Sequence, residues 1–191
     1  MDLTSEIDEI QHDKSHRGSA SQFYVAAELC RRGLVANVTL GNCPNVDVLC
    51  TNKEASRFVH VQVKTFVPGS RTCSVGKKAE KDFGESFFWI LAGIPEPGQA
   101  TDFLYYVIPS LEMSKNIREQ HEVWASTPGK KGQKRNGETT IRALGLPPWK
   151  SYNGWDISPY LNRWDLIISR FRTVPNLPLE LTAARKNEKS Q

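Results

Sequence analysis

The chain has 191 residues, of which 39% are hydrophobic and 24% are charged, as in a soluble globular protein. It contains no apolar run of the roughly 18 residues that a transmembrane helix needs, and it begins with an acidic, polar stretch rather than a signal peptide. We therefore expect a cytoplasmic protein with no membrane partner, and the net charge of +4 permits a nucleic-acid partner without requiring one.

Polar segments flank one predicted domain. Residues 1–16 are charged and polar, which indicates an N-terminal arm or a short helix, and residues 181–191 are expected to form a polar tail. Residues 17–180 contain no internal repeat and have the length of a single domain.

A helix is predicted near the start of this domain, over residues 18–32. Ser19 or Ser21 can cap its first turn, and Gly33 can take the left-handed conformation that ends a helix. Its apolar residues recur at helical spacing: Val25, Ala26 and Leu29. Gln22 precedes that apolar stripe by three to four residues, so we expect its side chain to face the sheet.

Three strands are predicted after the helix. Residues 34–40 form the first, and a turn over residues 41–45 leads into the second, over residues 46–50. A polar connection joins the second strand to the third, over residues 58–66, so the two form a hairpin. Valines alternate along the third strand with three polar residues, His60, Gln62 and Lys64. The period of two places the polar residues together on one face.

Asp47 lies inside the apolar run of the second strand, where a carboxylate is costly to bury unless it is paired or bound to a cation. Neighbouring strands lie about 4.8 Å apart, so Asp47 can lie beside Gln62 and Lys64 on one face. Carboxylate and amide oxygens suit Mg²⁺, and a nearby lysine can position an attacking water or stabilise charge on a phosphate. An exposed strand face with Asp47 in an ordinary salt bridge would show the same pattern.

At these residues the sequence resembles the PD-(D/E)XK nuclease superfamily, which has the restriction-endonuclease-like fold. The resemblance lies in Asp47, which follows Asn45 and Val46, and in the sequence Gln62-Val63-Lys64. It also covers the preceding helix, where Gln22 stands at the position that usually holds glutamate. The order of helix, strand, strand with Asp and strand with Q-x-K is the family's core order. The resemblance implies an α/β fold with a central mixed β-sheet flanked by helices.

The same resemblance implies a nuclease that hydrolyses phosphodiester bonds with Mg²⁺ or Mn²⁺, with DNA as the expected substrate. Asp47, the Gln62 side-chain oxygen and the Val63 carbonyl would bind the metal, Lys64 would orient the attacking water, and Gln22 would hold a metal-bound water. A homodimer would allow both strands to be cut. Because Gln22 and Gln62 are both neutral, the alternative is a weak or inactive nuclease-fold protein that binds nucleic acid or a protein partner.

The later elements are less distinctive. Residues 77–84 are predicted to be a helical turn or a loop, and residues 87–94 form a nearly continuous apolar run typical of a strand buried on both faces. Residues 102–109 are predicted to form another strand, and residues 110–113 resemble the start of a short helix. A closing helix is expected over residues 159–168.

Basic residues are candidates for binding nucleic acid in two segments. The candidates are Lys77 and Lys78 in the first segment, and Lys130, Lys131, Lys134 and Arg135 in the second. The second segment, residues 127–138, is also rich in glycine, which lets backbone amides approach phosphates. It is either a phosphate-binding flap or a solvated loop.

Overall fold

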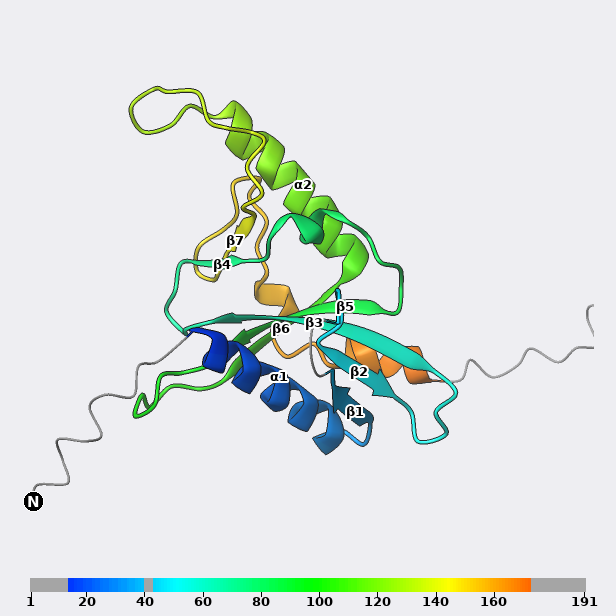
Figure 1. The fold of residues 1–191 in the computed structure, drawn as a ribbon. Helices are drawn as coiled ribbons and strands as arrows, with labels where there is room; N and C mark the ends of the chain where they lie inside the picture. Colours follow the sequence, from blue (N-terminus) through cyan, green and yellow to red (C-terminus); the bar gives the residue numbers. More distant parts are fainter. Residues whose placement is uncertain (1–13, 40–42, 173–191) are drawn as a thin grey trace, which may run out of the picture.

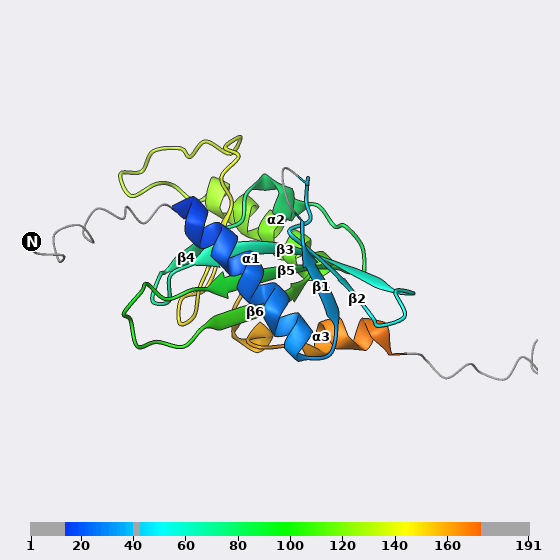
Figure 2. The ribbon, with the colours of Figure 1, turned by 60° about the horizontal axis from the view of Figure 1, so that its bottom comes forward.

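The computed structural model describes residues 14–39 and 43–172. Five strands form a central mixed sheet in the order β1-β2-β3-β5-β6, with helices on both of its faces (Figures 1 and 2). The expected α/β fold with a mixed sheet flanked by helices is therefore confirmed. Most of the predicted N-terminal arm and all of the predicted tail lie outside the described residues.

The first helix, α1, spans Lys14–Arg31 and is followed by Gly33, whose φ of +86° is the left-handed conformation expected after a helix. The helix begins four residues earlier than predicted, so the predicted serine cap is wrong. Ser21 is buried inside the helix, and its hydroxyl donates a hydrogen bond of 2.7 Å to the carbonyl of Gly18, one turn back.

The strands pair largely as the sequence predicts. Strands β1 (Val35–Val38) and β2 (Val48–Thr51) are antiparallel, and β2 forms the expected antiparallel hairpin with β3 (Phe58–Phe66). Strand β3 then pairs in parallel with β5 (Phe87–Gly93), which is antiparallel to β6 (Leu104–Pro109). Every residue of β5 is buried, because both faces of the sheet are covered at its centre.

Strand β3 separates two hydrophobic cores. Its valines pack with α1 in the first core: Val59, Val61 and Val63. Gln62 and Lys64 lie on the opposite face, because the register pairs them with Trp89 and Leu91 of β5, which belong to the second core. The predicted separation of valines and polar residues onto two faces is confirmed.

The second core is covered by α2 (Ser110–Ser126) and by a small antiparallel sheet of β4 (Thr72–Ser74) and β7 (Ala143–Gly145). A 3-10 helix, η2 (Lys77–Glu80), occupies the segment predicted to be a helical turn or a loop. Helix α2 has 17 residues, so the expected short helix is wrong. Its buried stripe contains polar residues as well as apolar ones: Ser110, Met113, Ser114, Ile117 and Gln120.

The expected closing helix is also interrupted. The chain forms η3 (Ser158–Tyr160), α3 (Asp165–Ile168) and η4 (Ser169–Phe171) instead of one continuous helix. Asn162 lies between η3 and α3, where its φ of +53° is left-handed and incompatible with a right-handed helix, while η4 follows α3 directly. Within residues 14–39 and 43–172, the structure has no helix with the length and apolarity to cross a bilayer.

Candidate functional site

Asp47 lies directly before β2 and is held by strand-like hydrogen bonds on both sides. Its N–H donates to the carbonyl of Val61 at 2.9 Å, and its carbonyl accepts from the N–H of Thr39 at 2.9 Å. The antiparallel register of β2 and β3 begins at Val48 and Val61, so Asp47 lies directly beside Val61 and Gln62 of β3. The predicted neighbourhood of Asp47 and Gln62 is thus present.

The carboxylate of Asp47 is bound to two consecutive residues of β3. Its Oδ2 accepts one hydrogen bond from the side-chain amide of Gln62 and another, of 2.7 Å, from the N–H of Val63. The other oxygen, Oδ1, accepts no hydrogen bond from any residue that the structure describes. We call Asp47, Gln62, Val63 and Lys64 the Asp47 site.

Burial raises the pKa of Asp47. The Val63 N–H, the charge of Lys64 and the Gln62 amide each lower it, yet burial outweighs them. Asp47 also forms no ion pair among the described residues, which contradicts the ordinary salt-bridge alternative. A partly buried carboxylate that forms no ion pair is the kind of group that a bound cation stabilises.

Positive charge reaches the Asp47 site from two segments. Lys64 lies on the same face of β3 as Gln62, and its charge acts on Asp47 and on the buried thiol of Cys73 in β4. Lys78 of η2 also lowers the pKa of Asp47. The sequence indicated Lys78 only as a residue that binds nucleic acid, because its distance from Asp47 depends on the crossover between β3 and β5.

Three oxygens of the site would suit a hard cation if the Gln62 amide turned its oxygen toward it. Because the N–H and C=O of a strand residue point to the same side, the Val63 carbonyl faces the same side as its N–H, toward Asp47. The set would be Asp47 Oδ1, the Gln62 amide oxygen and the Val63 carbonyl, with water completing the shell. It carries one negative charge, and the described residues contain no cluster of three His, Cys, Asp or Glu side chains that could hold a metal.

Gln22 lies at the margin of the α1 face that packs on the sheet. That face contains Ser21, which is fully buried and whose hydroxyl lies 2.6 Å from the hydroxyl of Thr65. Helix α1 covers the valine face of β3, opposite Gln62 and Lys64. No hydrogen bond joins Gln22 to the Asp47 site in the described part of the chain, so its role as the holder of a metal-bound water stays a prediction.

The second basic segment lies apart from the Asp47 site. It belongs to the loop that continues beyond the C-terminal end of α2, away from the central sheet (Figure 1). Lys130, Lys131 and Lys134 are exposed there, whereas Arg135 is half-buried and its guanidinium carbon lies 5.0 Å from the ring centre of Trp124. The three lysines remain candidates for phosphate contact, while Arg135 already has a packing role.

Comparisons with known proteins add a structural likeness. No protein-family model matches the chain, and no curated protein matches it. The fold is similar to the solved structure of a bacterial homing endonuclease, I-Ssp6803I, with a TM-score of 0.46 and 17% sequence identity. The likeness covers 92% of this chain and 98% of the endonuclease chain.

Proposed function

We propose that this protein is a metal-dependent nuclease that hydrolyses phosphodiester bonds of nucleic acid, with DNA as the expected substrate, at the Asp47 site. One observation carries the proposal. A partly buried carboxylate without an ion-pair partner among the described residues is held by the Gln62 amide and the Val63 N–H, on the same sheet face as Lys64. A protein that only binds nucleic acid does not need a carboxylate in that position, because it repels phosphate.

Mg²⁺ or Mn²⁺ would be held by the oxygens of Asp47, Gln62 and Val63. When bound, such an ion would polarise the phosphate and lower the pKa of a water ligand. The Gln62 amide now turns its nitrogen toward Asp47, so its oxygen would have to rotate toward the ion. The resemblance to the PD-(D/E)XK superfamily supports the same ligand set.

The lysines would act on the phosphate and on the attacking water. Lys64 is half-buried on the face that carries Gln62, so its ammonium can orient the water and stabilise negative charge on the phosphate. Lys78 supplies a second positive charge near Asp47 from a different segment. Together they offset the repulsion between Asp47 and the phosphate.

A plasmid-nicking assay with Mg²⁺ or Mn²⁺ tests the proposal directly. We expect nicking by the unmodified protein and its loss in Asp47→Asn and Lys64→Met. Asp102→Asn and Lys115→Met are matched controls, because both residues are exposed and lie outside the Asp47 site. Nicking that survives Asp47→Asn would contradict the proposal, and binding of DNA without cleavage in either metal would favour the inactive alternative.

A further inference from the structure

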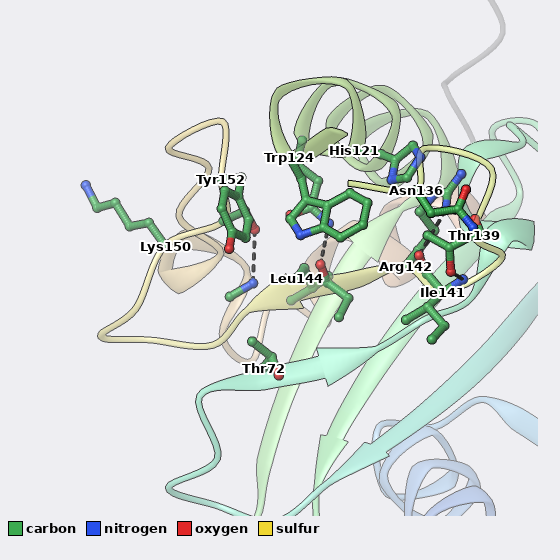
Figure 3. A pocket seen from close by; sticks show the side chains of 14 residues that line it. Thr72, His121, Trp124, Asn136, Thr139, Ile141, Arg142, Leu144, Lys150 and Tyr152 are labelled. Carbon is green, nitrogen blue, oxygen red and sulfur yellow. Dashed lines mark hydrogen bonds between the residues drawn. The ribbon is translucent and has the colours of Figure 1, made fainter. Parts of the chain in front are cut away.

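A second site is a cavity of about 430 Å³, a volume typical of ligand sites. It lies between the C-terminal half of α2, the small β4–β7 sheet and the two segments that precede and follow β7. Figure 3 shows Trp124 of α2 and Tyr152 side by side above β7, while Lys150 points outward. The residues of the Asp47 site are not part of its lining.

Trp124 and Tyr152 both contact one planar group. The guanidinium carbon of Arg135 lies 5.0 Å from the ring centre of Trp124 and 5.1 Å from that of Tyr152. Arg135 thus covers one face of each ring. Both aromatic side chains also line the cavity, whereas Arg135 does not, so the ring surface on the cavity side can stack on a flat ligand such as a nucleobase.

One buried polar atom of the cavity lining lacks a hydrogen-bond partner within the described residues. Gln120, 4% exposed, donates from its Nε2 to the carbonyl of Ala143, but its buried Oε1 accepts nothing. Buried polar atoms are normally paired, so this oxygen indicates a ligand that donates a hydrogen bond to it.

The other charged groups of the cavity point to an anionic ligand. Arg142 is buried, but its charge is compensated by an ion pair with Glu80, and its Nη1 donates to the carbonyl of Ile141 at 2.9 Å. Lys150 is exposed at the rim and has no ion-pair partner in the described ranges. A positive charge therefore remains at the mouth of the cavity.

We propose that this cavity binds a nucleobase, with the attached phosphate beside Lys150. A nucleobase is flat, so it can stack on Trp124 and Tyr152, and its Watson–Crick edge carries both donors and acceptors. The base can come from a nucleotide turned out of a nucleic-acid strand or from a free nucleotide. The proposal does not rest on hydrolysis at Asp47, because binding alone defines it.

The small sheet separates the cavity from the Asp47 site. Thr72 of β4 lines the cavity, and the next residue, Cys73, is buried in the second core, where the charge of Lys64 acts on it. Successive side chains of a strand point to opposite faces.

The binding of free nucleotides tests whether the cavity recognises a nucleobase. Calorimetry on the full chain carrying Asp47→Asn, in metal-free buffer, would compare AMP, CMP, GMP and UMP with ribose 5-phosphate, which lacks the base. We expect at least one nucleotide to bind roughly 5- to 150-fold more tightly than ribose 5-phosphate, the range of one stacked base. Trp124→Leu should remove this difference, whereas the matched control Trp149→Leu, outside the cavity lining, should keep it.

A single-stranded oligonucleotide and copies with one abasic position, moved along the strand, test the polymer as the source. A loss of affinity at one abasic position, abolished by Trp124→Leu, would assign the cavity to a base of a strand. Base-dependent binding of mononucleotides alone would assign it to a free nucleotide. Gln120→Met keeps the side-chain size and serves as a second cavity variant if Trp124→Leu fails to fold. Equal binding with and without the base in both tests would overturn the proposal.

Discussion

The N–H of Val63 donates a hydrogen bond of 2.7 Å to Oδ2 of Asp47, which ties the carboxylate to the middle residue of the Gln62-Val63-Lys64 sequence. Because the donor is a backbone group, the interaction depends on the pairing of β2 with β3 and not on the side chain at position 63. It leaves Oδ1 of Asp47 free of hydrogen bonds from the described residues, and it orients the Val63 carbonyl toward the same side.

Asp47→Asn should separate activity from stability. An asparagine oxygen can still accept from the Val63 N–H, but the neutral side chain is a poor metal ligand. We expect cleavage to fall by at least about a hundredfold, as when one stabilising group of an active site is removed. The unfolding free energy at pH 7 should stay equal or rise, because the variant no longer buries a charge. Urea unfolding and single-turnover cleavage would measure both.

The pH dependence of stability follows from the raised pKa of Asp47. The unfolded pKa of an aspartate is about 3.9. The pKa of Asp47 is higher in the folded protein, so protonated Asp47 favours the folded state. This contribution to the free energy of unfolding is fully present below about pH 3.9 and is lost as the pH rises through the folded pKa. The stability of Asp47→Asn relative to the unmodified protein should therefore increase with pH. A relative stability that decreases over this window would show that ionised Asp47 is favourable.

Gln62→Glu should make the fold more dependent on metal. The change replaces the amide that donates to Asp47 with a second carboxylate, so like charges face each other without metal. We expect a lower melting temperature in EDTA and a larger stabilisation by Mg²⁺ or Mn²⁺ than in the unmodified protein, since carboxylates strengthen the binding of hard cations. Gln22→Glu should show the same metal effect only if Gln22 faces the site. Thermal melts across a metal titration would compare the two.

Lys64→Met should raise the pKa of Asp47 further, because the nearby positive charge now lowers it. We expect cleavage to drop by roughly 10²- to 10³-fold, as for loss of one preorganised group that stabilises transition-state charge. Lys78→Met should shift the pKa in the same direction. Lys115→Met, on the exposed face of α2, should change neither quantity. NMR titration of the Asp47 carboxyl would detect the shift, and an unchanged pKa in Lys64→Met would place its ammonium away from the site.

The exposed loop lysines should govern the salt dependence of binding. Replacing Lys130, Lys131 and Lys134 with alanine should reduce the slope of log affinity against log salt by up to about 2.7 on double-stranded DNA, or about 0.9 for each phosphate that a lysine no longer neutralises. Arg135→Ala should instead lower the melting temperature, because its guanidinium packs on Trp124 and Tyr152. An unchanged slope in the triple variant would identify the segment as a solvated loop.

The sequence alone determined the hairpin and the placement of Asp47, Gln62 and Lys64 on one sheet face. Those features are local, because a period of two decides the face of each side chain and a short connection decides the strand pairing. The bounds of β3 agree with the prediction for the same reason. The continuous apolar run at residues 87–94 likewise indicated a strand buried on both faces.

The tertiary structure alone decided how distant segments meet. The charge of Lys78 lowers the pKa of Asp47 because the connection between β3 and β5 brings Lys78 near it. The local sequence pattern does not specify the path of that connection. The length of helix α2 could not be predicted from its apolar residues alone, because its buried stripe includes the polar Gln120, which donates to a carbonyl of β7. Trp124 and Tyr152 come from separate elements and meet only when α2 packs against the small sheet. Such arrangements arise from packing between elements, so the periodicity of a single helix or strand cannot predict them.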